Sequence, residues 1–143
     1  MKNNNISFFL VSFKQGFVSP KLPIATFEQD GKKLNFLLDS GSDNNVINKE
    51  MLSTLNHEKI ETVTNLAGVG GVSKTKACRI KFSCGDQEYT EDFLITDLSQ
   101  AFGLIEQEHC IPLHGIIGSS FLRKNNIVMD FEKLIAYSKE KKE

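Results

Sequence analysis

Asp39, Ser40 and Gly41 directly follow the apolar run Phe36-Leu37-Leu38, and this arrangement could present one reactive carboxylate. A strand that buries the apolar run carries Asp39 to the edge of a core, where burial and neighbouring groups shift the pKa of a carboxyl. Gly41 permits the close approach of another backbone, or a φ that other residues avoid. Asp-Ser-Gly is also ordinary turn chemistry, so the three residues alone leave a structural turn as the alternative.

Two other segments carry glycines that matter together with this carboxylate. Residues 66–72 hold three glycines between strand-like stretches. They lack the lysine of a phosphate-binding loop and no helix is predicted after them, so they favour a mobile hairpin tip that closes over a ligand. A simple hairpin loop is the alternative. Residues 115–118 place two apolar residues between glycines, and Gly118 permits a close backbone approach.

Short strands separated by turns must position these segments. The pattern predicts three hairpins, formed by residues 22–29 with 33–38, 75–83 with 87–95, and 127–131 with 133–138. Asp30-Gly31 is a strong turn signal for the first hairpin. Two short helices are expected, one after Asn48 as its N-cap and one from Ser119 to about Lys124. Residues 97–113 are expected to form a loop with a helical turn, which leaves a mostly-β chain.

Composition places the chain among single-domain globular proteins. It has 143 residues, 40% of them hydrophobic, and a net charge of −1, a balance that gives no electrostatic footprint for nucleic acid or an anionic membrane. Three cysteines without a C-x-x-C pair indicate neither a disulfide framework nor a zinc module. No signal-peptide core or membrane-length apolar run is present. We therefore expect a cytoplasmic protein, although a leader trimmed from the chain would leave no trace here.

The histidines and cysteines suggest weaker alternatives. His109, Cys110 and His114 lie close in sequence, but their spacing matches no standard metal site. A Cys–His protease that uses Cys110 is formally open, although nothing in the sequence orients the pair. Cys78 alternates with polar residues and fits a buried strand face better than a nucleophile. We therefore expect no metal site.

The order of the three motifs resembles the retropepsin-like aspartic proteases. Residues 36–43 resemble their catalytic loop, residues 66–72 the flap of retroviral proteases, and residues 115–131 the closing segment of pepsin lobes. The resemblance covers residues 22–138. It implies an all-β, single-lobe fold, a closed barrel with one or two short helices. Residues 1–143 would then be one domain, with an N-terminal strand or arm at 1–20 and a charged tail at 139–143.

The resemblance also implies a mechanism. Two carboxylates about 3 Å apart share one proton, so that one acts as general base on a water while the other polarises the scissile carbonyl. This chain has a single Asp-Ser-Gly, and the second carboxylate must come from a second copy placed across a two-fold axis. The expected protein is a homodimeric aspartic endopeptidase that cleaves an extended peptide or protein and needs no cofactor.

Residue roles follow from the resemblance by position. Asp39 is the expected catalytic residue, supported by Ser40, Gly41 and Ser42. Ser40 would hydrogen-bond across the two-fold axis. A Ser42 hydroxyl that donates to the carboxylates would favour their ionised form and predicts an acidic pH optimum. The remaining expected site residues contact substrate or support the loop from beneath: Asp43, Gly68, Val69, Gly70 and Gly71 for substrate, and Ile116, Ile117 and Gly118 for support.

The chain also departs from the retroviral pattern. Ser119-Ser120 stands where retroviral enzymes carry a basic residue, so the salt bridge made by that residue is absent or is supplied by Arg123. Residues 8–13 and 134–138 are candidates for the terminal strands that interleave in viral dimers. Because fold alone does not establish activity, a catalytically inactive dimerisation or peptide-binding module of the same fold is the alternative function.

Overall fold

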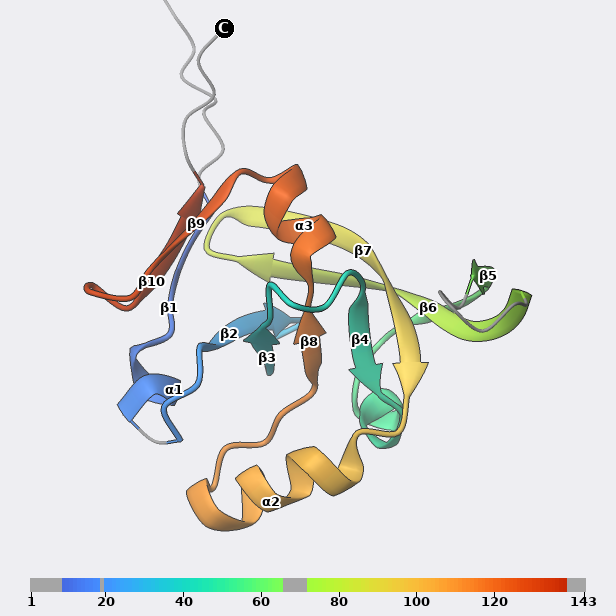
Figure 1. Ribbon diagram of the computed structural model, residues 1–143, viewed down its shortest axis with the longest axis horizontal. Coiled ribbons are helices and arrows are strands. Elements are labelled where there is room, and N and C mark those ends of the chain that lie inside the picture. The colour runs from blue at the N-terminus through green and yellow to red at the C-terminus, as the bar shows by residue number, and fades with distance from the viewer. Residues whose placement is uncertain (1–8, 19, 66–71, 139–143) are drawn as a thin grey trace, which may run out of the picture.

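The computed structural model describes residues 9–18, 20–65 and 72–138. Figure 1 labels its helices and strands. In chain order they are β1 (Leu10–Ser12), α1 (Lys14–Val18), β2 (Ile24–Gln29), β3 (Lys32–Leu38), β4 (Asn45–Asn48), the 3-10 helix η1 (Lys49–Thr54), β5 (Glu58–Asn65), β6 (Val72–Cys84), β7 (Gln87–Thr96), α2 (Ser99–His109), β8 (Gly115–Ile117), α3 (Ser119–Lys124), β9 (Ile127–Asp130) and β10 (Ile135–Ser138). None of the helices in these ranges is long and apolar enough to cross a membrane.

Six strands close into a barrel. They are hydrogen-bonded in the order β2-β3-β8-β4-β7-β6, and β6 returns to β2 where Ser83 pairs with Glu28. β5 lies outside this closed set and pairs only with β6, from Glu58 opposite Arg79 to Asn65 opposite Val72. The mostly-β closed barrel expected from the sequence is confirmed.

The three hairpins predicted from turn signals are all present. β2 pairs with β3, β6 with β7, and β9 with β10, each antiparallel. Asp30 and Gly31 both have positive φ, 49° and 80°, as the two-residue turn that matches the twist of a hairpin requires. Gly85, between β6 and β7, also has a positive φ of 60°. In the β2–β3 and β6–β7 hairpins, the turn residues therefore have the backbone conformation that the predicted strand pairing requires.

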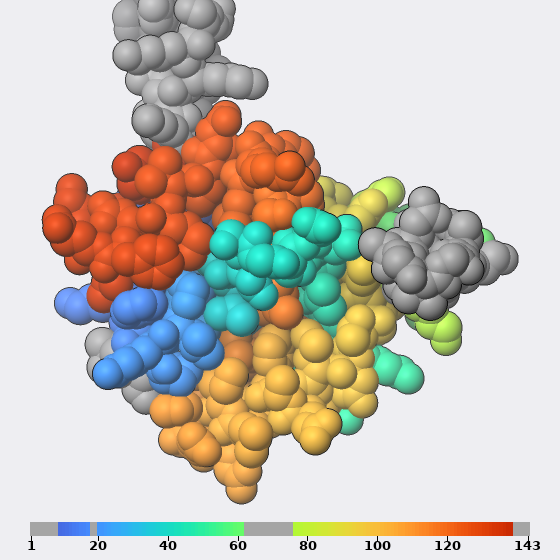
Figure 2. Space-filling view, viewed as in Figure 1, coloured from blue at the N-terminus to red at the C-terminus, as the bar shows by residue number. Residues whose placement is uncertain are grey.

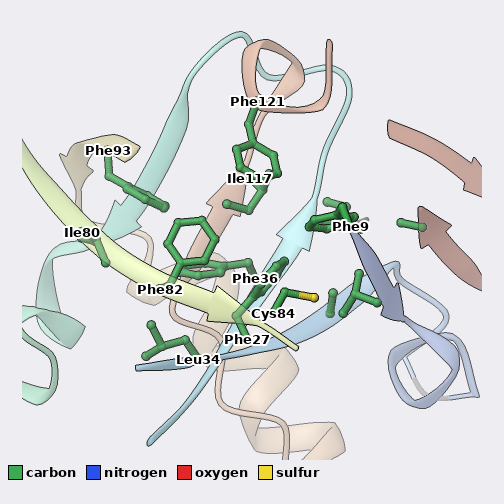
Figure 3. Packing of buried hydrophobic residues seen from close by; sticks show 14 of the residues in the cluster. Phe9, Phe27, Leu34, Phe36, Ile80, Phe82, Cys84, Phe93, Ile117 and Phe121 are labelled. Carbon is green, nitrogen blue, oxygen red and sulfur yellow. The ribbon is translucent and has the colours of Figure 1, made fainter. Parts of the chain in front are cut away.

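Phenylalanine side chains fill the barrel (Figure 3). Seven phenylalanines of the described residues are less than 2% exposed: Phe9, Phe13, Phe27, Phe36, Phe82, Phe93 and Phe121. The Phe82 ring lies 5.3 Å from that of Phe27 and 5.7 Å from that of Phe36, both edge to face, a preferred geometry for aromatic pairs. β3 alternates, so Phe36 and Leu38 point into this core while Leu37 points outward. Cys78 is fully buried on its strand, as predicted.

A second sheet joins the two ends of the described chain. Its three strands lie in the order β1-β10-β9, with Leu10 opposite Tyr137 and Ile135 opposite Asp130. The segments considered from sequence as interleaving dimer strands therefore pair with each other within one chain. β1 and β9 form the two edges of this sheet. Phe9, just before β1, packs against Phe27 and Phe121 and joins the sheet to the barrel core.

The helices differ most from expectation. The region predicted as a loop with one helical turn contains α2, a helix of 11 residues, whose C-cap Cys110 is left-handed at φ 58°. Its N-cap Leu98 makes no side-chain cap and Gly103 stands in its middle. Asp97 Oδ1 accepts the Ser99 N–H at 3.0 Å, so the capping side chain lies one residue before the N-cap position where a helix signal is expected. Asn48 is the N-cap residue of η1, as expected, but its side chain makes no capping hydrogen bond and instead accepts the Leu98 N–H at 3.0 Å.

Candidate active site

The loop that carries Asp39 begins where β3 ends. The Asp39 N–H donates to the carbonyl of Ile117 at 2.9 Å, and the Ser42 N–H donates to the carbonyl of Asp39 at 3.1 Å. The Gly41 N–H donates to Asp39 Oδ1 at 2.9 Å, so the backbone of the loop orients the carboxylate. Asp39 itself is half-buried, whereas Ser40 and Gly41 are exposed. The carboxylate is thus held in place at the surface of the barrel.

β8 and α3 support this loop from beneath. β8 lies between β3 and β4, parallel to the first with Ile117 beside Leu38, and antiparallel to the second with Ile116 opposite Val46. Where β8 passes into α3, the Ser119 N–H donates to the Ser42 carbonyl at 2.6 Å and the Ser120 N–H to the Asp43 carbonyl at 3.3 Å. The structure therefore brings residues 117–120, which include Ile117 and Gly118 of the three expected supporting residues, against the Asp39 loop.

Gly118 is needed for space. A Cβ at this position would lie 2.6 Å from the Ser42 carbonyl oxygen and closer still to that of Asn44. Its φ of −96° is one that any residue adopts, so the requirement is steric. Because both obstacles are backbone atoms, a side chain here would push the Asp39 loop away from β8.

Asn45 is a site residue that sequence reasoning missed. It is buried, and its Oδ1 accepts the Gly118 N–H at 2.9 Å, while its Nδ2 donates to the carbonyl of Asp92 at 3.3 Å. One amide side chain thus ties the Asp39 loop to β7 and satisfies a buried backbone donor. The only signal in the sequence is an amide at the first position of a strand, and the exposed Asn44 beside it gives the same signal.

The polar residues of the loop differ in part from expectation. The Ser42 hydroxyl donates to the carbonyl of Asn44 at 2.7 Å. Because a hydroxyl has one proton to donate, Ser42 does not donate to Asp39 in this arrangement. Asp43 is exposed. Arg123 Nε donates to the Ser119 carbonyl at 3.4 Å, and Arg123 takes part in none of the ion pairs found between described residues.

The expected flap lies only partly within the described residues. Leu66 to Gly71, with the tip residues Gly68, Val69, Gly70 and Gly71, are outside them. The strands on either side are described: β5 and β6 pair as far as Asn65 opposite Val72. Figure 1 shows this β5–β6 hairpin projecting beyond the barrel. The flap therefore stays a prediction, carried by a hairpin that the structure does contain.

A groove of about 1010 Å³ runs beside the loop and has Asp39 and Ser40 in its wall. We call it the Asp39 groove. Its other lining residues are mainly apolar: Phe17, Lys21, Leu22, Pro23, Leu37, Leu38, Ser119, Leu122, Arg123, Asn126, Ile127, Met129 and Phe131. Figure 2 shows the loop in the middle of one face, bordered by the residues before β2, the β9–β10 hairpin and α2. Such an apolar concavity beside an oriented carboxylate suits the binding of an organic ligand.

Titratable groups away from the Asp39 loop have structural surroundings, including Cys78 and His114, which were considered from the sequence. Asp130 Oδ1 accepts the N–H groups of Glu132 and Lys133, both at 2.9 Å, and these bonds lower the pKa of Asp130. Burial raises the pKa of Cys78 to about 11, with a further contribution from Asp92. His114 is buried, which lowers its pKa, and its Nδ1 accepts the Asn35 N–H at 3.1 Å. Among the described residues no group of three or more potential metal ligands gathers.

Comparisons with known proteins identify the family and the fold of this chain. A family model for aspartyl protease matches residues 25–121, and no curated protein matches the chain. The solved structure of EIAV protease with the inhibitor HBY-793 is 23% identical, with a TM-score of 0.50 over 74% of this chain and 89% of that one. The retroviral protease-like domain of Ddi1 from Leishmania major is 15% identical, with a TM-score of 0.47 over 78% of this chain and 82% of that one. The chain belongs to the aspartyl protease family and has a retropepsin-like fold.

Proposed function

We propose that this protein is an aspartic endopeptidase that works as a homodimer. The observation that carries the proposal is the hydrogen-bonded frame around one half-buried carboxylate, Asp39, in the wall of an apolar groove. The chain has a single Asp-Ser-Gly, so a two-fold arrangement would place Asp39 against Asp39 of the partner subunit. Family membership supports protease chemistry, and the arrangement of the loop supports this residue as its centre.

The chemistry follows from two carboxylates that share one proton. The ionised carboxylate takes a proton from a water, whose oxygen attacks the scissile carbonyl carbon while the protonated carboxyl donates to the carbonyl oxygen. The tetrahedral intermediate then collapses, the C–N bond breaks, and a proton passes to the leaving amine. The Gly41 N–H, bonded to Asp39 Oδ1, would hold each carboxylate in the orientation that sharing requires.

The surrounding residues take the roles expected from their positions. Ser40 is exposed beside Asp39 and is proposed to hydrogen-bond across the two-fold axis. Asp43 is proposed to contact the backbone of an extended peptide, which would lie beneath the flap of residues 68–71 and pair with strand edges. The proposal treats residues 1–143 as one domain. Its terminal sheet leaves β9 as an edge beside the Asp39 groove, which offers a surface for the second copy.

Cleavage of a mixed peptide library tests this function. Wild type and Asp39→Asn are incubated with the library from about pH 3 to about pH 7, and new termini are identified by mass spectrometry. We expect cleavage by wild type, and loss of about a thousandfold or more in Asp39→Asn, with an unchanged melting temperature. Equal and negligible cleavage by both proteins would contradict the proposal. Binding of peptides without cleavage would favour the inactive peptide-binding module.

A further inference from the structure

The strands that carry the site have a second apolar face outside the barrel. Leu37 of β3 and Ile116 of β8 are paired in register. Both pack against a small cluster of buried residues formed by Ile24, Phe102 and Leu113, which we call the α2 cluster. Phe102 is the buried residue of α2. The helix that sequence analysis missed therefore covers the outer face of the strands that hold Asp39.

Two residues connect the α2 cluster to the Asp39 groove. Leu22 and Leu37 are half-buried side chains that pack against the cluster and also line the groove. Leu37 lies on β3, two residues before Asp39, which follows the end of that strand. Leu22 and Leu37 therefore link the packing of α2 on the cluster to the groove wall next to the carboxylate, because packed side chains transmit a displacement to their neighbours.

The groove has two walls of different origin. On one side, the lining residues come from the β9–β10 hairpin: Ile127, Met129 and Phe131. The edge strand β9 on this side is the surface proposed to contact a second copy. Leu22 and Leu37 form the other wall, the one that α2 supports. If a second copy contacts β9, the wall formed by Leu22 and Leu37 stays accessible to a peptide. Both of these side chains are aliphatic.

We infer that α2 sets the width of the Asp39 groove and so selects the size of the apolar peptide side chain accepted next to the scissile bond. This inference rests on the proposed function. Phe102 is then a positioning residue that acts through Leu37. Within the described residues, the other contacts of α2 also go to this cluster and not to the barrel core: Ile105 packs against it, and Glu106 Oε1 accepts the Leu113 N–H at 3.1 Å, while Leu104 is 59% exposed. A change in the seating of α2 therefore leaves the barrel core intact.

Peptide binding in the inactive Asp39→Asn background tests the inference without requiring cleavage. The probes are three peptides that differ only in having Ala, Leu or Phe before the bond that wild type cleaves, or, where wild type cleaves none, at the centre of an extended apolar octapeptide. Dissociation constants are measured for Asp39→Asn alone and combined with Phe102→Leu. The matched control is Leu104→Ala, which removes an exposed side chain from the same helix.

The expected result is a change in selectivity. Phe102→Leu leaves space in the cluster against which Leu37 packs. The groove then widens, and the preference for Phe over Ala rises about tenfold, the scale on which pockets discriminate apolar groups. Leu104→Ala leaves the preference unchanged. Phe102→Leu keeps an apolar side chain in the cluster, so the variant retains its fold, and its melting curve checks this directly.

Three outcomes would overturn the inference: no peptide binds, the preference is unchanged in Phe102→Leu, or both variants shift it alike. A double-mutant cycle with Leu37→Ala adds a readout that a purely structural role would not move, because it must show coupling between Phe102 and Leu37 in the preference itself. If selectivity depends on Phe102 while wild type cleaves none of the bound peptides, the inference stands and the proposed catalytic function fails.

Discussion

The barrel core and the α2 cluster lie on opposite faces of the same two strands, yet they are built differently. The barrel core includes six fully buried phenylalanines that are linked by ring contacts: Phe9, Phe27, Phe36, Phe82, Phe93 and Phe121. The α2 cluster has three buried residues, and the six apolar residues around it are only half-buried. Because stabilisation scales with the apolar area removed from water, the barrel core maintains the fold. Substitutions in the α2 cluster are expected to be tolerated better than substitutions in the barrel core. The residues that pack against the α2 cluster also form part of the groove wall.

The two faces also differ in how they hold the Asp39 loop. On the β8 and α3 side the contacts are backbone hydrogen bonds, such as Ser119 N–H to Ser42 O at 2.6 Å, reinforced by the Asn45 amide. On the α2 side the contact is side-chain packing through Leu37. The position of the carboxylate is therefore fixed by backbone geometry, and the shape of the groove beside it by replaceable side chains.

The largest expected effect separates the two apolar regions directly. Phe82→Ala removes a ring packed among Phe27, Phe36 and Phe93, so it should cost near the upper end of about 3–5 kcal/mol in unfolding free energy. Phe102→Ala should cost at or below the lower end, because half-buried neighbours can collapse into the space. Urea denaturation of both variants measures the difference. Equal costs would show that the two regions are energetically alike.

Two glycine substitutions sharpen the comparison. Gly118→Ala places a Cβ against the carbonyl oxygens of Ser42 and Asn44, and it should cost about 3 kcal/mol and disturb the Asp39 loop. Gly103→Ala meets nothing within 4 Å in the middle of α2, and it should stabilise by about 0.5–1 kcal/mol, the usual difference in a helix. Thermal melts measure both changes: the melting temperature should fall for Gly118→Ala and rise for Gly103→Ala. Destabilisation by Gly103→Ala would contradict the account of α2.

A smaller effect is expected from the amide that ties the loop to β7. Asn45→Ala leaves the buried N–H of Gly118 without its acceptor and should cost about 1–3 kcal/mol. The matched control Asn44→Ala removes an exposed neighbouring amide and should change stability by less than about 0.5 kcal/mol. Chemical denaturation of Asn45→Ala and Asn44→Ala measures both costs. Similar losses of unfolding free energy in the two variants would mean that the Asn45 hydrogen bond does not stabilise the loop.

The smallest expected effect is a pH dependence on the α2 side. Burial lowers the pKa of His114 from its usual 6.5, and Glu106 opposes this only in part. Since the unfolded chain binds the proton first, His114 contributes stability above pH 6.5 that is lost as the pH falls through 6.5 towards the folded-state pKa. The melting temperature of wild type relative to His114→Gln should therefore decline between about pH 7 and about pH 5. A difference in melting temperature between the two proteins that stays constant across this range would contradict the lowered pKa of His114.

Sequence reasoning succeeded where one local rule decides the structure. Asp30-Gly31 and Gly85 set their hairpins through positive φ. Gly118 was expected to permit a close backbone approach, and the Ser42 and Asn44 carbonyls are the atoms that approach it. The apolar run 36–38 was expected to form a buried strand that ends at Asp39; the strand is present with Phe36 and Leu38 buried, but Leu37 is half-buried on the outer face.

Sequence reasoning failed where tertiary contacts decide. α2 has no capping side chain at Leu98 and a glycine within it, and it is held by the burial of Phe102, which depends on β3 and β8 being beneath it. Asn45 and Asn48 act across more than 45 residues of sequence, on Gly118 and Leu98. No local pattern distinguishes these two buried amides from the exposed Asn44.

The most direct test of the central claim, that Asp39 is half of a site completed by a second copy, is a subunit-mixing assay. Wild type at fixed concentration is equilibrated with increasing Asp39→Asn protein, exchange is verified by native mass spectrometry, and peptide cleavage is measured. If each site needs two Asp39 carboxylates, a tenfold excess of the variant should reduce wild-type cleavage to about one tenth, because most wild-type chains then pair with an inactive partner. Undiminished cleavage in the presence of mixed dimers, or in a sample that stays strictly monomeric, would contradict the account.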